Sequence, residues 1–246
     1  MLSKNIVAHT LEYFATNSHR DFVVKPSLPI LYFGNLDEYR SSLLKVVTVG
    51  KNPSNNEFCR KKGDAYSFCR FKKWKPDEGN LIESLNPYFQ DEPLSWFSCY
   101  EPVLKGMGCS YYSGRTKNRA LHTDICSPIA TNPTWSKLKQ SQQALLYREG
   151  IGLWKQLIDE LQPDVLLISV PQQLFSSNFH AVGKDLIAFD SRSDGIKRNE
   201  RYRVVEQIWT LTSGKTVKVV FGQAAQTPFG TISSAQKIEV GKSCLR

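Results

Sequence analysis

The alternation of apolar and polar residues predicts an α/β chain with buried strands and one long amphipathic helix. Residues 46–50 (VVTVG) and 165–170 (VLLISV) are almost wholly aliphatic, which is typical of strands buried on both faces of a parallel sheet. Residues 141–161 place Leu, Ile and Trp on one broad face and predict a helix that ends before Pro163. A further strand at residues 119–125 precedes that helix. The order strand, helix, strand predicts a right-handed βαβ unit.

Weaker patterns predict the remaining elements. Residues 21–35, which contain Pro26 and Pro29, predict an extended segment that packs over the core. Residues 204–211 and 216–221 predict two strands joined by a turn. Helices are predicted at residues 1–20, 81–85 and 96–107.

The size of the chain limits its organisation. With 246 residues, 41% of them hydrophobic, it can form one large domain or two small ones. We expect a single domain over residues 1–246, with residues 1–27 as an N-terminal helical and extended segment packed against it. The first residues show no secretory signal, and no apolar run approaches membrane-spanning length. We therefore expect a cytoplasmic protein that does not contact membranes.

The charge balance suggests a polyanionic partner. The net charge is +9, with 32 Lys and Arg against 23 Asp and Glu, so nucleic acid is the first candidate partner. Two polar stretches carry the clearest candidates for phosphate contacts, and a solvated surface loop is the alternative for each. These candidates are Lys72 and Lys73 within residues 59–80, and Arg192, Lys197 and Arg198 within residues 191–203.

The cysteines do not indicate a metal site. None of the six forms a CxxC pair, and the two evenly spaced pairs have nine residues between their members, which is not a zinc or iron–sulfur spacing. We expect no metal and no cofactor. Reduced and mostly buried thiols are the simpler interpretation.

Three polar loops each follow a predicted strand. In the first, Gly50 to Ser54 (GKNPS), Pro53 has a fixed φ and pushes Asn52 out of the helical region. Ligands bind at this edge of open α/β sheets, although an ordinary turn has the same composition. In the second, His122, Thr123 and Asp124 end a strand. A carboxylate there is costly unless it is paired or used. His122 is either a general acid or base or a satisfied core residue.

The third loop, residues 222–234 (GQAAQTPFGTISS), is rich in small residues, which let a backbone approach a ligand closely. Its candidates for DNA contact are Gln223, Gln226, Thr227 and Phe229. Phe229 stands in a Pro-Phe-Gly turn, where an exposed ring can act as a wedge that enters a base stack. Ordinary packing of Phe229 is the alternative.

The order of these loops resembles that of the uracil-DNA glycosylase superfamily over residues 28–235. The resemblance implies a three-layer α/β/α fold with a central, mostly parallel four-stranded sheet. GKNPS is similar to the superfamily's water-positioning loop, G-x-N-P-G/S, and Asp124 falls where an Asn usually reads the flipped base. Asn52 and Asp124 would be catalytic. The implied base-binding residues are Gly50, Lys51, Pro53, Ser54 and Thr123, with Tyr66 or Phe68 stacking on the base.

The chain also departs from the family pattern. The last motif usually contains His-Pro-Ser, and here Gln223 or Gln226 would have to donate in place of the histidine. No cysteine precedes the first motif, unlike in the iron–sulfur branch. As a carboxylate, Asp124 only accepts hydrogen bonds, and its best base partner is the exocyclic amine of cytosine. A modified cytosine, such as the hydroxymethylated or glucosylated bases of phage DNA, is therefore the expected substrate, although no residue indicates a sugar pocket.

The expected function is a monofunctional DNA glycosylase that flips a base from double-stranded DNA and leaves an abasic site, acting as a monomer in antiviral defence. A uracil or mismatch glycosylase is the alternative enzyme, with a protonated Asp124 donating to O4. The altered third motif also fits a DNA-binding module that lacks catalysis. An α/β nucleotide- or metabolite-binding protein is the remaining alternative.

Overall fold

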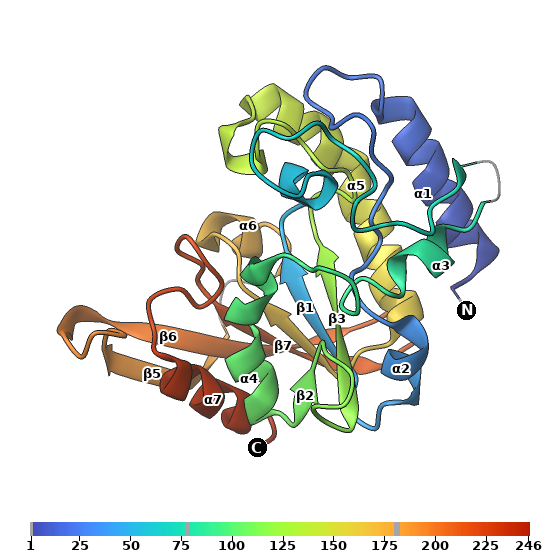
Figure 1. Cartoon of the computed structure of the whole chain (residues 1–246). Helices are drawn as coiled ribbons and strands as arrows, with labels where there is room; N and C mark the ends of the chain where they lie inside the picture. Colours follow the sequence, from blue (N-terminus) through green and yellow to red (C-terminus); the bar gives the residue numbers. More distant parts are fainter. Residues whose placement is uncertain (1, 77–78, 180–182) are drawn as a thin grey trace. The chain divides into compact units, whose positions relative to one another are not determined.

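The computed structural model describes residues 2–76, 79–179 and 183–246 (Figure 1). The chain divides into two compact units, each built from separate segments. The first unit contains Met1–Asp37, Gly50–Leu94 and Leu121–Leu161. The second contains Glu38–Val49, Ser95–Ala120 and Gln162–Arg246. Asp77 and Glu78, within the basic stretch 59–80, lie outside the described residues.

A mixed sheet has seven strands in the order β2-β3-β1-β4-β7-β6-β5, and most of its residues belong to the second unit. β2 pairs with β3, β1 with β4, and β4 with β7 in parallel, whereas β7, β6 and β5 are antiparallel. β1 and β4 are buried along their whole length, as their aliphatic sequences predict. The α/β class is thus confirmed. The strands are β1 (Val46–Gly50), β2 (Cys109–Ser110), β3 (Asn118–Asp124), β4 (Val165–Ile168), β5 (Lys184–Ser191), β6 (Lys197–Thr210) and β7 (Thr216–Gly222).

The sheet has more strands than the four expected, because the polar strands were not predicted from the sequence. Residues 191–203, predicted as a loop, form the end of β5, a turn and the first half of β6. Two exposed ion pairs cross the strands, Arg201 with Asp190 and Arg203 with Asp185, both at 2.7 Å. Such cross-strand pairs support a sheet without apolar alternation. β2 has only two residues and no pattern of its own.

The helices of the second unit are short. The helix predicted at residues 96–107 is instead a 3-10 turn, η3 (Ser95–Cys99), followed by α4. α4 packs against α7, and Gly106 and Gly241 bring the two backbones so close that a Cβ on either glycine would clash with the partner helix. The α-helices are α2 (Leu36–Ser41), which starts in the first unit, α4 (Glu101–Gly106), α6 (Gln172–Ser176) and α7 (Ser234–Ser243).

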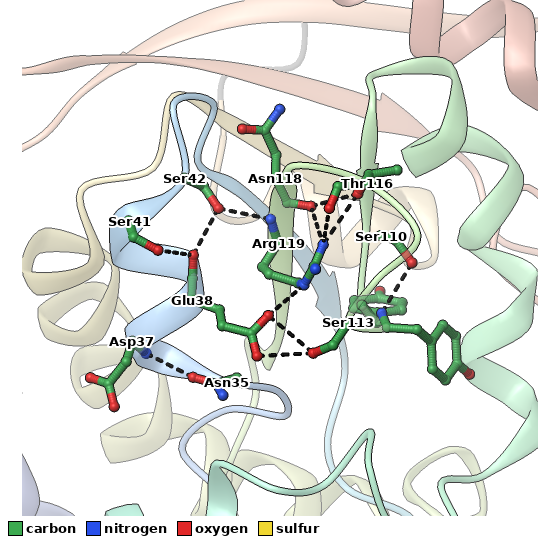
Figure 2. Close-up of polar contacts among 12 residues, drawn as sticks. Asn35, Asp37, Glu38, Ser41, Ser42, Ser110, Ser113, Thr116, Asn118 and Arg119 are labelled. Carbon is green, nitrogen blue, oxygen red and sulfur yellow. Dashed lines mark hydrogen bonds and ion pairs between the residues drawn. The ribbon is translucent and has the colours of Figure 1, made fainter.

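A buried arginine fastens the start of β3 within the second unit (Figure 2). The Arg119 side chain donates to the Glu38 carboxylate and to the Thr116 carbonyl, both at 2.6 Å. Its backbone N–H donates to the Ser42 hydroxyl at 2.8 Å. Arg119 is only 8% exposed, so these acceptors compensate for the loss of water around its charge.

The first unit is mainly helical. Its longest helix, α5, runs from Gln140 to Leu161, and the prediction for residues 141–161 is confirmed. The Tyr13 hydroxyl joins α1 to this helix by donating to the Leu146 carbonyl at 2.8 Å. The other elements of this unit are α1 (Lys4–Asn17), η1 (Asn55–Phe58), α3 (Leu81–Leu85) and η4 (Trp135–Lys137). No helix in the described part of the chain combines the length and apolarity needed to cross a membrane.

The predicted extended segment 21–35 packs within the first unit. It makes an isolated bridge from Val23 to Thr131 and another from Phe33 to His122. Val23 and Phe33 are buried. The segment is therefore bonded both to β3 and to the residues that follow it.

Candidate functional site

The loop after β1 is held by the chain that continues from β3. The N–H of Ile125 donates to the Gly50 carbonyl at 3.1 Å, and the N–H of Cys126 donates to the Lys51 carbonyl at 2.8 Å. Ser54 makes a further bridge to Thr131. The loops GKNPS and HTDICSP therefore lie side by side in the first unit.

Asn52 is fixed by both of its amide protons. Its Nδ2 donates to the Ile129 carbonyl at 3.2 Å and to the Thr131 hydroxyl at 3.1 Å. These two acceptors decide which way the amide faces. Oδ1 is then the atom of the half-exposed side chain that can accept a further hydrogen bond. The arrangement presents one acceptor in a fixed place.

Asp124 and His122 approach the backbone of Gly50. A Cβ built on Gly50 would lie 2.6 Å from Asp124 Oδ1 and 2.8 Å from His122 Nε2. His122 Nε2 is 3.6 Å from Asp124 Oδ1, and both side chains are almost fully buried. Only glycine leaves room for this approach, which gives Gly50 a steric role. Asn52 lies two residues after Gly50 in the same loop.

Thr123 does not join Asp124. Successive side chains of a strand point to opposite faces, so His122 and Asp124 share one face of β3 and Thr123 takes the other. The buried Thr123 hydroxyl accepts from Trp154 Nε1 at 3.0 Å. The Thr123 hydroxyl therefore anchors α5 and does not share a face of β3 with Asp124.

Glu57 is a buried carboxyl that the sequence did not reveal. It belongs to η1 and is 2% exposed. Burial raises the pKa of Glu57 to about 8, and the nearby Asp124 charge acts in the same direction, against a hydrogen bond from Tyr88 and the positive charge of Arg70. The Tyr88 hydroxyl donates to Glu57 Oε2 at 2.6 Å. The signal was weak, because one Glu among Asn residues is typical of an exposed turn.

Arg70 serves the structure of this loop. It is buried, and its guanidinium donates to the carbonyls of Asn56 at 2.8 Å, Cys59 at 2.7 Å and Glu92 at 2.7 Å. These bonds fold the basic stretch around η1. Lys72 and Lys73 of the same stretch are exposed, and Lys72 lies 3.6 Å from Asp91.

The other residues predicted near the base have mixed positions. Lys51 donates to the Ser136 hydroxyl at 2.7 Å, and burial lowers its pKa, although Cys126 and Asp124 act in the opposite direction. Pro53 is buried, and the Ser54 hydroxyl caps η1 by accepting from the N–H of Asn56 at 3.1 Å. The half-exposed candidates for stacking are Tyr66, whose hydroxyl accepts from Asn55 at 3.1 Å, and Phe68, whose ring lies 6.3 Å from that of Phe58.

Phe229 is not an exposed wedge. It is completely buried in the second unit, with its ring 6.1 Å from that of Tyr100. Its backbone takes a left-handed φ of 48°, and its N–H donates to the Ser169 hydroxyl at 2.9 Å. Gly222 leaves the space that the ring fills. The prediction of a DNA-contacting Phe229 is wrong, and the packing alternative describes it.

The remaining residues predicted to contact DNA lie in the second unit. Gln223 and Gln226 are exposed and Thr227 is half-exposed. Arg192 and Lys197 are exposed at the β5–β6 turn. Arg198 is half-buried and donates to the carbonyls of Ser191 and Thr231, so it holds the hairpin in place.

The cysteines are reduced and dispersed in the structure. Four of the six cysteines are buried, as predicted. Within residues 2–76, 79–179 and 183–246, no group of three His, Cys, Asp or Glu residues is arranged to hold a metal ion.

Comparison with known proteins does not identify the chain. No protein-family model matches it, and no curated protein matches it in sequence. Function is therefore inferred from the side chains of the first unit and their surroundings.

Gly50→Ala tests the close approach of the two loops. The added Cβ would displace the Asp124 carboxylate, so we expect the free energy of unfolding to fall by about 1–3 kcal/mol in urea denaturation. Gly152→Ala is the matched control, because a Cβ there meets open space on α5. That change should raise stability by about 0.5–1 kcal/mol through helix propensity. Equal stability of Gly50→Ala and the wild type would contradict the steric role.

Glu57→Gln tests the buried carboxyl. Between the ordinary pKa of 4.5 and the folded value of about 8, the folded chain binds a proton that the unfolded chain has lost. The free energy of unfolding should therefore fall as pH rises through this window, by up to about 1.4 kcal/mol per pH unit.

Glu57→Gln should lose this component of the slope, as measured by urea denaturation at pH 5, 6.5 and 8. Glu83→Gln, at an exposed position, should keep it. The same pH dependence in Glu57→Gln and the wild type would show that Glu57 is ionised in the folded chain.

Proposed function

We propose that the chain is a monofunctional DNA glycosylase of the uracil-DNA glycosylase type, with that superfamily's three-layer fold. It hydrolyses the N-glycosidic bond of a modified cytosine in phage DNA and leaves an abasic site. One observation carries the proposal. An anchored amide, Asn52, and a buried carboxyl, Asp124, come from the ends of neighbouring strands and are joined through the bare backbone of Gly50.

The orientation of the Asn52 amide suits it to position the attacking water molecule. With both amide protons bound, Oδ1 can accept a hydrogen bond from a water and point the water's lone pair at C1′. The glycosidic bond breaks through an oxocarbenium-like state, as in sugar hydrolysis. A fixed polar group of this kind typically contributes a few kcal/mol to the barrier.

Asp124 suits the recognition of a cytosine-type base. A carboxylate accepts from the N4 amine, which uracil lacks. The base is rotated out of the duplex to reach a buried group, and Tyr66 and Phe68 are the half-exposed rings available for stacking. The exposed cations Lys72, Lys73, Arg192 and Lys197 are available for phosphate contacts.

Asn52→Ala tests the proposed chemistry. On duplexes with hydroxymethylated or glucosylated cytosine, the wild type should yield abasic sites, revealed as alkali-dependent strand breaks. Asn52→Ala should be slower by about 10²–10³-fold and should keep the salt-dependent affinity for DNA. Asn56→Ala changes an exposed amide of the same loop and should keep wild-type activity.

Two results would reject the enzyme. Salt-dependent DNA binding without product on any duplex would leave a non-catalytic DNA-binding module. Absence of both product and DNA affinity would leave a nucleotide- or metabolite-binding protein.

Asp124→Asn tests base selection. An amide offers both a donor and an acceptor, so the variant should lose about 1–3 kcal/mol of preference for cytosine-type bases and gain activity on uracil. Rates on duplexes that differ only in the target base measure the ratio. An unchanged ratio would show that Asp124 does not contact the base edge.

A further inference from the structure

We propose that Glu57 provides a proton-bearing carboxyl group beside the Asp124 carboxylate, and that the two side chains together read the N3 and N4 edge of a cytosine-type base. The inference rests on the proposed function and identifies a second specificity-determining residue for it. Glu57 stands five residues after Asn52, in the 3-10 turn that continues the GKNPS loop. Both acidic side chains thus belong to the two loops that form the candidate site.

The surroundings of Glu57 fix the position of its proton. The N–H of Leu94 donates to the Tyr88 hydroxyl at 3.2 Å, so Tyr88 directs its own proton to Glu57 Oε2. Oε2 is therefore an acceptor. The proton of a neutral Glu57 then lies on Oε1, which becomes an O–H donor.

The charges near Glu57 favour its neutral form. Burial is the main cause of its raised pKa, and the negative Asp124 adds to it. Arg70 opposes it, but the Arg70 guanidinium is already engaged by backbone carbonyls. The hydrogen bond from Tyr88 also opposes the rise, and burial outweighs both.

The two acidic side chains are linked through one aromatic ring. Phe33 contacts Tyr88, with ring centroids 4.8 Å apart, and His122, with centroids 5.7 Å apart. Phe33 also exchanges backbone hydrogen bonds with His122, at 2.9 and 3.0 Å. Tyr88 orients Glu57, and His122 lies 3.6 Å from Asp124. The Glu57–Tyr88 and Asp124–His122 pairs therefore share a common support.

A neutral carboxyl and a carboxylate complement the edge of cytosine. Cytosine presents a donor at N4 and an acceptor at N3, whereas uracil presents an acceptor at O4 and a donor at N3. Asp124 accepts from N4, and the Glu57 O–H donates to N3. Uracil would place its O4 acceptor against the Asp124 acceptor and its N3–H donor against the Glu57 O–H. Binding uracil would therefore leave buried polar groups unpaired, which costs more free energy than the loss of a contact. A substituent at C5 leaves N3 and N4 in place, so modified cytosines remain acceptable.

The pH dependence of excision tests the inference. Single-turnover rates on a duplex with modified cytosine are measured from pH 6 to pH 10 for the wild type, Glu57→Gln, Glu57→Ala and the exposed control Glu83→Gln. Wild type and control should lose activity about tenfold per pH unit above the Glu57 pKa of about 8. Glu57→Gln keeps an N–H donor that does not titrate, so its rate should show no alkaline fall between pH 8 and pH 10. Glu57→Ala has no donor and should be at least tenfold slower than Glu57→Gln at every pH.

The outcomes separate this inference from the proposed function. If the wild type excises the base and Glu57→Gln shows the same alkaline fall, Glu57 is not the donor. If Glu57→Ala is as active as Glu57→Gln, the carboxyl has no contact with the base. Should Glu57→Ala fail to fold, as judged by circular dichroism, the comparison of Glu57→Gln with the wild type still decides. A wild type that excises no base rejects the proposed function itself.

Discussion

The close approach of the Asp124 carboxylate to the backbone of Gly50 is the contact on which the site depends. A residue with a side chain at this position would hold the carboxylate and the His122 ring away from the end of β1. The backbone hydrogen bonds that follow, from Ile125 and Cys126 to Gly50 and Lys51, require the same proximity. Further along the first loop, the Asn52 amide donates to Ile129 and Thr131 of the segment that follows β3. Because Gly50 has no Cβ atom, the loops GKNPS and HTDICSP can pack against each other.

The polar groups of the first unit are oriented before any ligand arrives. Hydrogen bonds orient each of them: Asn52 donates to a carbonyl and a hydroxyl, Glu57 accepts from Tyr88, and Lys51 donates to Ser136. Burial makes an unpaired polar group costly, so each of these partners removes an alternative orientation. Groups that are held in this way need little rearrangement when charge develops near them. Arg70 contributes to the same rigidity, because its guanidinium donates to backbone carbonyls on both sides of η1.

Sequence reasoning succeeded where apolar periodicity was strong and failed where partners lay far apart in the chain. β1, β4 and α5 were predicted because continuous or helical runs of Val, Leu and Ile leave few alternatives. β5 and much of β6 were missed, since their charged and exposed residues lack apolar alternation and pair only through the hairpin. Phe229 was misplaced because a Pro-Phe-Gly turn suggests exposure, while the space beside Gly222 is visible only in three dimensions. Glu57 escaped notice because its partner, Tyr88, is 31 residues away. The position of Thr123 followed from simple alternation along β3 and was predictable.

The choice of an amide at position 52 has a consequence for which bonds the chain can break. An amide oxygen directs a water molecule but does not take up its proton and keep it, so it gives little help to the incoming nucleophile. Under the proposed function, the departing base must accept most of the electron pair by its own electronic character. Bases that are good leaving groups, such as those with electron-withdrawing substituents, would be released. The glycosidic bonds of unmodified nucleosides would hydrolyse too slowly to break while the base occupies the site. Chemical inertness, in addition to recognition, would then protect the genome of the cell that makes the enzyme.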